Sequence, residues 1–109
     1  MPAHGGGVKI STLVFVLFAG SVTAAPITPD TRTMASTCAA CHGTNGQSAG
    51  GIPTLAGLPK SYFIKQMQDF KSGARAATVM NRHAKGYSDA QIEQLAEYFT
   101  AQKRRQPQP

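Results

Sequence analysis

The residues with the clearest chemistry in this 109-residue chain are its only two cysteines and the histidine that follows the second one. They lie in the run Cys38-Ala39-Ala40-Cys41-His42, which is the attachment pattern of c-type haem. Residues three apart share a face of a helical turn, so both sulfurs can form thioethers with neighbouring vinyl groups on one haem edge. The next residue then directs its imidazole at the iron. The run predicts one covalently attached haem c, bound by Cys38 and Cys41 and ligated by His42.

Three other uses of a C-x-x-C pair fit the rest of the chain less well. A dithiol redox motif is typical of a βαβ pattern, and no strand-like run surrounds this pair. A zinc site would need a second pair of ligands, and the remaining histidines, His4 and His83, have the wrong spacing. A disulfide between residues three apart closes too small a loop to stabilise a fold much. Haem attachment is therefore the favoured interpretation.

The second axial position of the iron has three candidate ligands downstream, Met67, Met80 and His83. Met67 lies on the apolar stripe of a predicted helix, which is typical of a core methionine that fills gaps. Met80 lies in a less regular stretch, from which a thioether can approach the opposite face of the haem. His83 lies in a cationic stretch and is more typical of a surface imidazole. Met80 is therefore favoured, with His83 and an open or water-ligated iron as alternatives.

Ligation by methionine and histidine raises the reduction potential relative to two nitrogen ligands and leaves no open position for a substrate. This combination favours an electron carrier over an oxygenase or peroxidase. A haem sensor or a peroxidase-like enzyme would need Met80 to be absent from the iron or labile. The other ring nitrogen of His42 needs a hydrogen-bond partner that orients the ring, and the carbonyl of Pro53 is the candidate.

The first 25 residues are interpreted as a cleavable secretory signal peptide. A start with one cation leads to the apolar run 13–19, and the small residues 22–25 follow. Cleavage after Ala24 and cleavage after Ala25 satisfy the small-residue rule equally. The apolar run is too short to span a bilayer as a stable helix, and an uncleaved anchor is the alternative interpretation. Because haem is attached outside the cytoplasm and the signal resembles a bacterial one, we expect a periplasmic protein with no membrane span in its mature form.

Removing residues 1–25 leaves 84 residues, which we divide into one domain, 26–105, and a flexible tail, 106–109. Lys9 is the only charged residue in the removed part, so ten Lys and Arg face five Asp and Glu. Export and the lack of a patterned basic and aromatic surface argue against nucleic-acid binding. The positively charged residues include Arg75, Arg82, Lys85 and 103–105. They could simply face solvent, pair with the haem propionates or dock a partner.

The mature chain shows helical periodicity and no run with convincing strand alternation, so we predict an all-α domain. The predicted helices run from Thr28 or Pro29 to His42, from Pro59 to about Lys71, over a short stretch at 76–80 before Gly86, and from a Ser88–Gln91 capping box to about Lys103. A glycine-rich loop, 43–57, follows the haem motif. Because so small a domain seldom has a sufficient core of its own, we expect the haem-free chain to be poorly folded.

With these residues in place, the chain resembles a class I cytochrome c over most of residues 30–102. The general resemblance lies in the haem motif with Gly43, in Pro53 and Leu55, in Met80, and in the aromatic pair Tyr98 and Phe99. The middle segment is similar to cytochrome c4 and its relatives, through Pro53-Thr54-Leu55-Ala56-Gly57, Tyr62, Lys65-Gln66 and Asp69-Phe70-Lys71-Ser72-Gly73. Residues 78–88 resemble the cytochrome subunit of flavocytochrome c sulfide dehydrogenase.

The resemblance implies a class I cytochrome c fold of three to four helices wrapped around one covalent haem. It implies that Met80 is the axial ligand and that the Pro53 carbonyl bonds the haem histidine. It also implies a heterodimer in which an FAD-bearing subunit oxidises sulfide. This chain would then take the electrons one at a time and pass them to another cytochrome, with no substrate site of its own. Some flavocytochrome c partners carry two haem motifs, whereas this chain has one and would be a monohaem subunit.

The alternative is a free soluble monohaem cytochrome that shuttles electrons between respiratory or photosynthetic complexes. A permanent subunit is expected to bury a larger apolar patch than a transient carrier. The candidates for such a patch are Ile52, Leu58 and Ile64. The positive charge suits docking to an acidic partner in either case and does not separate the two.

Overall fold

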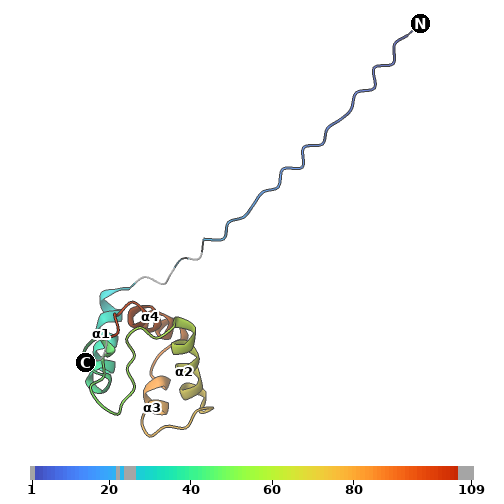
Figure 1. Ribbon diagram of the computed structural model, residues 1–109. Coiled ribbons are helices and arrows are strands. Elements are labelled where there is room, and N and C mark those ends of the chain that lie inside the picture. Colours follow the sequence, from blue (N-terminus) through green and yellow to red (C-terminus); the bar gives the residue numbers. More distant parts are fainter. Residues whose placement is uncertain (1, 22, 24–26, 106–109) are drawn as a thin grey trace.

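A computed structural model gives the fold, and it describes residues 2–21, 23 and 27–105. The elements follow in the order α1 (Pro29–His42), η1 (Thr44–Gly46), α2 (Lys60–Ser72), α3 (Met80–Lys85) and α4 (Asp89–Thr100). No strand occurs among the described residues, and the predicted all-α class is confirmed. The four helices gather into one body, whereas residues 2–21 extend away from it (Figure 1).

Helix α1 carries the haem motif in its last turn because both of its ends are capped. At the start, the Thr31 N–H donates to the Thr28 side chain at 3.2 Å, and the Thr28 N–H donates back to the Thr31 hydroxyl at 3.3 Å. At the other end, the Gly43 N–H donates to the Ala39 carbonyl at 2.9 Å. Gly43 has φ 83° and ψ 163°, which only glycine adopts readily. The predicted helix from Pro29 to His42 is therefore confirmed.

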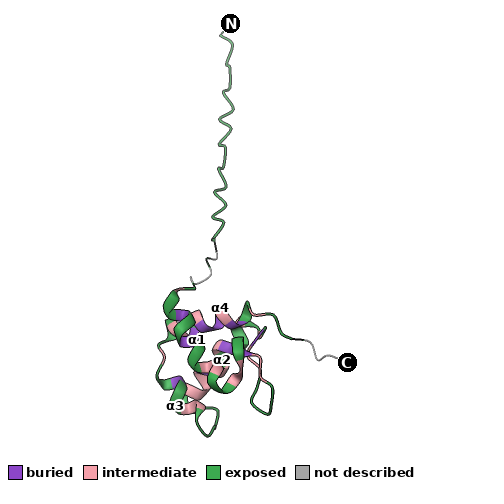
Figure 2. Cartoon of the chain, turned by 90° about the vertical axis from the view of Figure 1, so that its left-hand side faces the viewer, coloured by how far each residue is buried: buried purple, intermediate pink, exposed green. Residues whose placement is uncertain are grey.

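The apolar core lies where α1, α2 and α4 meet, and Figure 2 shows the buried residues of these helices in purple. The Phe63 and Phe99 rings stack with their centroids 5.7 Å apart, which joins α2 to α4. Met67 is only 6% exposed, as expected of a core methionine. The buried cluster comprises Met34, Ala35, Phe63, Met67, Ala84, Ile92, Leu95, Ala96 and Phe99.

The short helix predicted before Gly86 does end there, but its predicted start at 76 is wrong, because α3 begins only at Met80 and runs to Lys85. No side chain caps the helix at Val79. The Ala77 N–H donates instead to the Asn81 side chain at 2.8 Å, which holds the backbone before α3 in a turn. The alanines of this stretch are also exposed, so core packing does not favour a helix there.

The last helix ends at Thr100 and not near Lys103 as predicted. The Phe99 carbonyl accepts from the Gly57 N–H at 2.9 Å and from the Gln102 N–H at 3.1 Å. Beyond that turn, the Gln47 side-chain amide donates to the Lys103 carbonyl, and its oxygen accepts from the Arg105 N–H. Contacts with the loop thus stop the helix where its own periodicity continues.

The N-terminal residues 2–21 and 23 form no helix. Their apolar run 13–19 is exposed, with Phe18 at 94%. The predicted cleavage positions after Ala24 or Ala25 and the predicted tail 106–109 lie outside the described residues. Within the described ranges, no helix has both the length and the apolar character needed to cross a membrane.

Candidate haem-binding site

A cavity of about 480 Å³ lies between the end of α1, one face of α2, α3 and the loop that joins α1 to α2. It is lined by all five residues that the sequence singled out, Cys38, Cys41, His42, Pro53 and Met80. The volume is in the range of cofactor pockets. Most of the remaining wall is apolar, and it includes Ile52, Leu55, Leu58, Phe63, Met67, Phe70 and Val79.

The two cysteines lie one turn apart on α1 and both face the cavity. Cys38 is half-buried and Cys41 is exposed. Burial raises the pKa of the Cys38 thiol, although hydrogen bonding by Thr37 and Tyr87 acts in the opposite direction. The Cys38 thiol also lies 3.7 Å from the Met34 carbonyl, to which it donates. The pair therefore presents one protected and one accessible sulfur to the same cavity.

His42 is the last residue of α1, and its ring is held by the loop. Its Nδ1 lies 2.6 Å from the Pro53 carbonyl oxygen, the contact that the sequence analysis proposed. A carbonyl accepts only, so Nδ1 carries the proton and Nε2 has the free lone pair that a metal requires. The loop is itself fixed, because the N–H groups of Leu55 and Ala56 donate to the Gly46 carbonyl at 2.8 and 3.2 Å.

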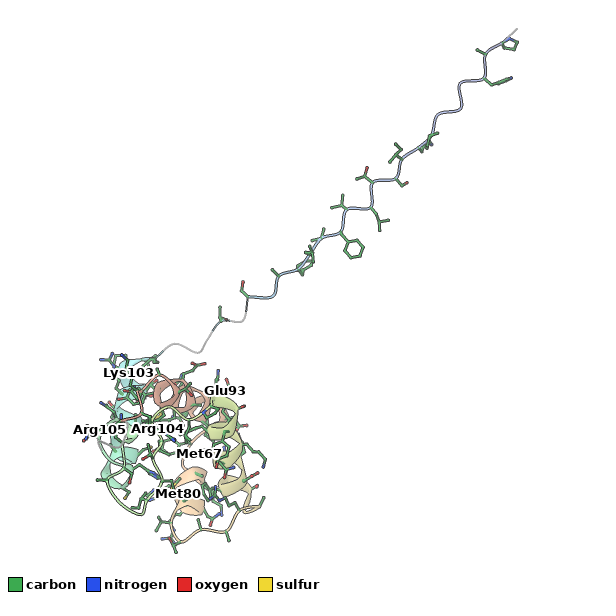
Figure 3. The ribbon with its side chains drawn as sticks, in the orientation of Figure 1. Met67, Met80, Glu93, Lys103, Arg104 and Arg105 are labelled. Atoms are coloured by element: carbon green, nitrogen blue, oxygen red, sulfur yellow. The ribbon has the colours of Figure 1, made fainter. Side chains whose placement is uncertain are left out.

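Methionines of two helices line the cavity, Met67 from α2 and Met80 from α3 (Figure 3). Met80 is half-buried at the edge of the core, and it is the first residue of α3. His83 follows one turn later and also lines the cavity, but its side chain is exposed. Met67 belongs to the buried core. Of the three candidate ligands, Met80 is the one that is neither committed to the core nor turned largely to solvent.

Sequence reasoning missed a polar pair beside Cys38. The Thr37 hydroxyl donates to the Met34 carbonyl at 2.7 Å, and the Tyr87 hydroxyl lies 2.9 Å from the Thr37 oxygen. Both Thr37 and Tyr87 line the cavity. The two residues are 50 positions apart and belong to no local motif, so nothing in the linear pattern joins them.

Arg75 is the only Lys or Arg among the residues that line the cavity. Its guanidinium lies 4.8 Å from the centroid of the Phe70 ring and donates to the Gln66 side chain. Sequence analysis grouped Arg75 with the other cations and left solvated faces, propionate pairing and docking open. Arg75 lies on the cavity wall, whereas the cations of the C-terminal segment, 103–105, do not line the cavity.

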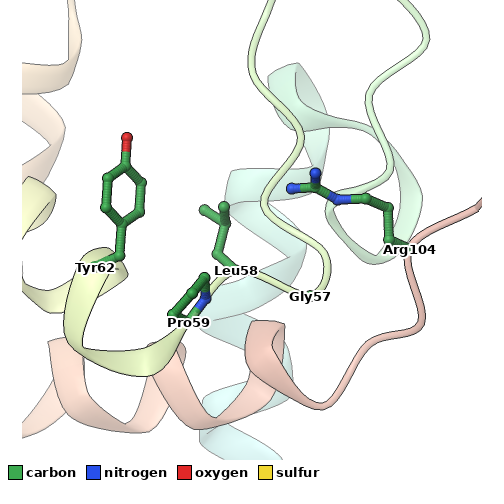
Figure 4. A pocket seen from close by; sticks show the side chains of 5 residues that line it. All are labelled: Gly57, Leu58, Pro59, Tyr62 and Arg104. Atoms are coloured by element: carbon green, nitrogen blue, oxygen red, sulfur yellow. The ribbon is translucent and has the colours of Figure 1, made fainter.

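One of those C-terminal cations has a structural contact. Arg104 lines a shallow pocket beside the cavity, together with Gly57, Leu58, Pro59 and Tyr62 (Figure 4). The Arg104 Nε donates to the Ala56 carbonyl at 3.2 Å. This bond holds the C-terminal segment against the loop that carries Pro53.

The residues of the cavity fit a covalently bound haem. Two sulfurs one helical turn apart match a double thioether attachment, and an imidazole with its Nε2 lone pair free matches a metal ligand. The apolar wall matches a large, flat, apolar group. Cys38 and Cys41 would hold the haem, and His42 and Met80 would bind its iron.

Comparison with known proteins agrees with this fit. Residues 31–103 match the cytochrome c family. The cytochrome subunit of sulfide dehydrogenase from Chlorobaculum tepidum is 50% identical over 62 residues, which cover 57% of this chain and 56% of the relative. The thiosulfate dehydrogenase electron acceptor of Thiomonas intermedia is 39% identical over 93 residues, which cover 84% of this chain and 41% of the relative.

The solved structure of cytochrome c4 from Acidithiobacillus ferrooxidans superposes with a TM-score of 0.57 at 42% identity, covering 59% of this chain and 37% of that one. The chain thus spans about half or less of the length of these three relatives. The family match itself covers well over half of this chain and contains the whole cavity wall. The chain therefore belongs to the cytochrome c family, whose members carry covalently bound haem c.

Proposed function

We propose that this chain is the haem subunit of a sulfide dehydrogenase and accepts electrons from an FAD-bearing partner subunit. The observation that carries the proposal is the 50% identity over 62 residues with the sulfide dehydrogenase subunit of Chlorobaculum tepidum. In this proposal the flavoprotein oxidises sulfide, and this chain passes the electrons on to another cytochrome. The first 25 residues direct the protein to the periplasm, where the haem is attached.

Within this function, each of the five cavity residues that the sequence singled out has an assigned role. When bound, the haem supplies a one-electron centre whose potential is raised by methionine ligation. Cys38 and Cys41 attach it covalently. His42, oriented by the Pro53 carbonyl at 2.6 Å, would bind the iron through Nε2, and Met80 would supply the second protein ligand, which would leave no iron position for a substrate. The apolar side chains of α2 exclude water from the cavity.

A free electron carrier is the second candidate, and two observations favour it. The Thiomonas intermedia relative, an electron acceptor by name, aligns with 84% of this chain. In addition, only Ile52 of the three predicted patch residues is exposed, at 44%, while Leu58 and Ile64 pack partly against the core. These three side chains therefore do not form the wide apolar patch that a permanent interface buries.

Purification from the natural host by haem absorbance separates the two candidates. A subunit of sulfide dehydrogenase should elute with a stoichiometric flavin-containing chain, and sulfide should reduce the haem of that complex. A protein that elutes as a flavin-free monomer, and that no flavoprotein fraction of the same extract reduces with sulfide, would contradict the proposal. Such a monomer would support the free carrier.

A further inference from the structure

We propose that Asn81 is a positioning residue that keeps Met80 at the cavity. The inference rests on the proposed assignment of Met80 as a ligand and goes beyond it. Asn81 follows Met80 directly as the second residue of α3 and is half-buried. Its side chain points back from α3 to the end of α2 and to the segment that joins the two helices, as its hydrogen bonds show.

The Asn81 amide binds three backbone groups at once. Its Nδ2 donates to the Phe70 carbonyl at 3.0 Å and to the Arg75 carbonyl at 2.7 Å. Its Oδ1 accepts from the Ala77 N–H at 2.8 Å. Both amide hydrogens and the oxygen are thus in use, a combination that only an amide side chain of this length provides. One side chain therefore ties together the end of α2, the connecting segment and α3.

The connecting segment has few other constraints. Residues 76–79 are exposed and line the cavity. Within the described part of the chain, the only hydrogen bond of residues 76–78 is the one from Ala77 to Asn81. Without the Asn81 side chain, residues 76–78 would have no hydrogen bond to hold them in place as part of the cavity wall.

Helix α3 does not hold Met80 by itself either. It has six residues and no side-chain cap at Val79, and a helix of that length is unstable without tertiary contacts. Its inner anchor is Ala84, which is fully buried, but Ala84 lies a full turn beyond Met80. At the end that carries Met80, the anchor is Asn81.

In this arrangement Met80 leaves the iron when residues 76–79 and the start of α3 open locally. The rate at which an added ligand replaces Met80 then follows the population of the open form. Loss of the Asn81 amide should raise that population about tenfold, the effect of one or two net hydrogen bonds. The folded core formed by α1, α2 and α4 is not part of the opening.

The test is the rate at which imidazole, a neutral ligand, replaces the methionine in ferric holoprotein. Asn81→Ala should react about tenfold faster than wild type. Arg82→Ala is the matched control, because Arg82 is the next residue of α3 and is exposed. Ile92→Val is the second control, because it weakens the buried core without touching the cavity wall. Both controls should stay within about twofold of wild type.

A wild-type rate for Asn81→Ala would overturn the inference, as would an equal acceleration by Ile92→Val, which would show a general loss of stability. Met80→Ala tests the underlying assignment separately. If Met80 is the ligand, Met80→Ala loses the weak near-infrared sulfur-to-iron band. If the band persists, the assignment of Met80 is wrong and Asn81 has no ligand to position. If the band is lost while Asn81→Ala reacts like wild type, only the inference about Asn81 fails.

Discussion

Two glycines with the same φ end helices in this chain, but their surroundings differ. Gly43 follows α1 and Gly73 follows α2, and both have φ 83°. Gly73 has ψ 4°, in the left-handed region that other residues enter at moderate cost, whereas Gly43 has ψ 163°. A Cβ on Gly43 would lie 2.6 Å from the Gln47 carbonyl carbon, while a Cβ on Gly73 would meet nothing within 4 Å. The two glycines share one φ value and differ in the space that a Cβ would have.

Replacing these glycines by alanine should therefore have unequal effects. Gly73→Ala should lower the free energy of unfolding by about 1 kcal/mol, the strain of a left-handed alanine. Gly43→Ala should lower it by about 3 kcal/mol or more, because the conformation is open almost only to glycine and the new methyl overlaps fixed backbone. Guanidinium unfolding of the two holoproteins, followed by far-UV circular dichroism, measures the difference. Equal losses would show that the backbone near Gln47 yields easily.

At this scale, the sequence predicts residues that belong to a local motif and misses those that act through distant partners. Cys38 and His42 were found because their chemistry depends on spacing along one helix. Thr37 and Asn81 were not, because their roles depend on Tyr87 and on the backbone of the segment 70–77, which folding brings to them. A hydroxyl or an amide whose partners lie far away in the sequence has no fixed spacing to mark it.

Helices α1, α2 and α4 were predictable because each carries its own start signal or a buried stripe. Ser88 and Gln91 form the predicted capping box, with the Gln91 N–H donating to Ser88 at 3.2 Å and the Ser88 N–H donating to Gln91 at 2.9 Å. The errors lie at α3 and at the end of α4. The start of α3 is set by the Asn81 side chain, which binds the backbone of Ala77, and the end of α4 is set by the loop residue Gly57, which donates to the Phe99 carbonyl. Local periodicity does not contain such contacts.

Asp89 joins α4 to α2 through a small polar cluster. As the first residue of α4, its carboxylate accepts from Gln68 at 2.9 Å and from Lys71 at 3.2 Å. These hydrogen bonds, from Gln68 first, and the charge of Lys71 hold the pKa of Asp89 below its usual value of 3.8. The unfolded chain therefore binds this proton more readily than the folded chain. The stability that Asp89 contributes is complete above pH 3.8 and is lost as the pH falls through the lower folded value.

Asp89→Asn should accordingly lower the melting temperature at neutral pH by a small amount, because the carboxylate is exposed. The difference from wild type should shrink to the loss of the uncharged contacts as the pH falls below 3.8. Thermal unfolding of both holoproteins across the acid range measures this. Glu93→Gln is the control, because Glu93 lies on the same helix and takes part in none of the ion pairs of the described residues, and it should leave the melting temperature at neutral pH close to that of wild type. A difference for Asp89→Asn that is the same at every pH would contradict the linkage.

At the scale of the whole molecule, the cavity adjoins the apolar core of the helices. The buried side chains cluster between α1, α2 and α4, while Leu55, Leu58 and Phe70 are only partly buried and line the cavity. Without a group in the cavity of about 480 Å³, the apolar side chains of its wall stay in contact with water, which forgoes about 25 cal/mol for each Å² of apolar surface that the group would cover. We therefore expect the fold to depend on the haem that its own motif attaches.

The haem-free chain should consequently be poorly folded. In the double variant with Cys38→Ala and Cys41→Ala no thioether can form. We expect much weaker helical circular dichroism than in the holoprotein and no cooperative thermal transition. Added haemin should restore part of the helicity, because His42 and the apolar wall remain, and this recovery would assign the loss to the missing cofactor and not to the alanines. Full helicity with a cooperative transition before haemin is added would show that α1, α2 and α4 form a sufficient core without the cofactor.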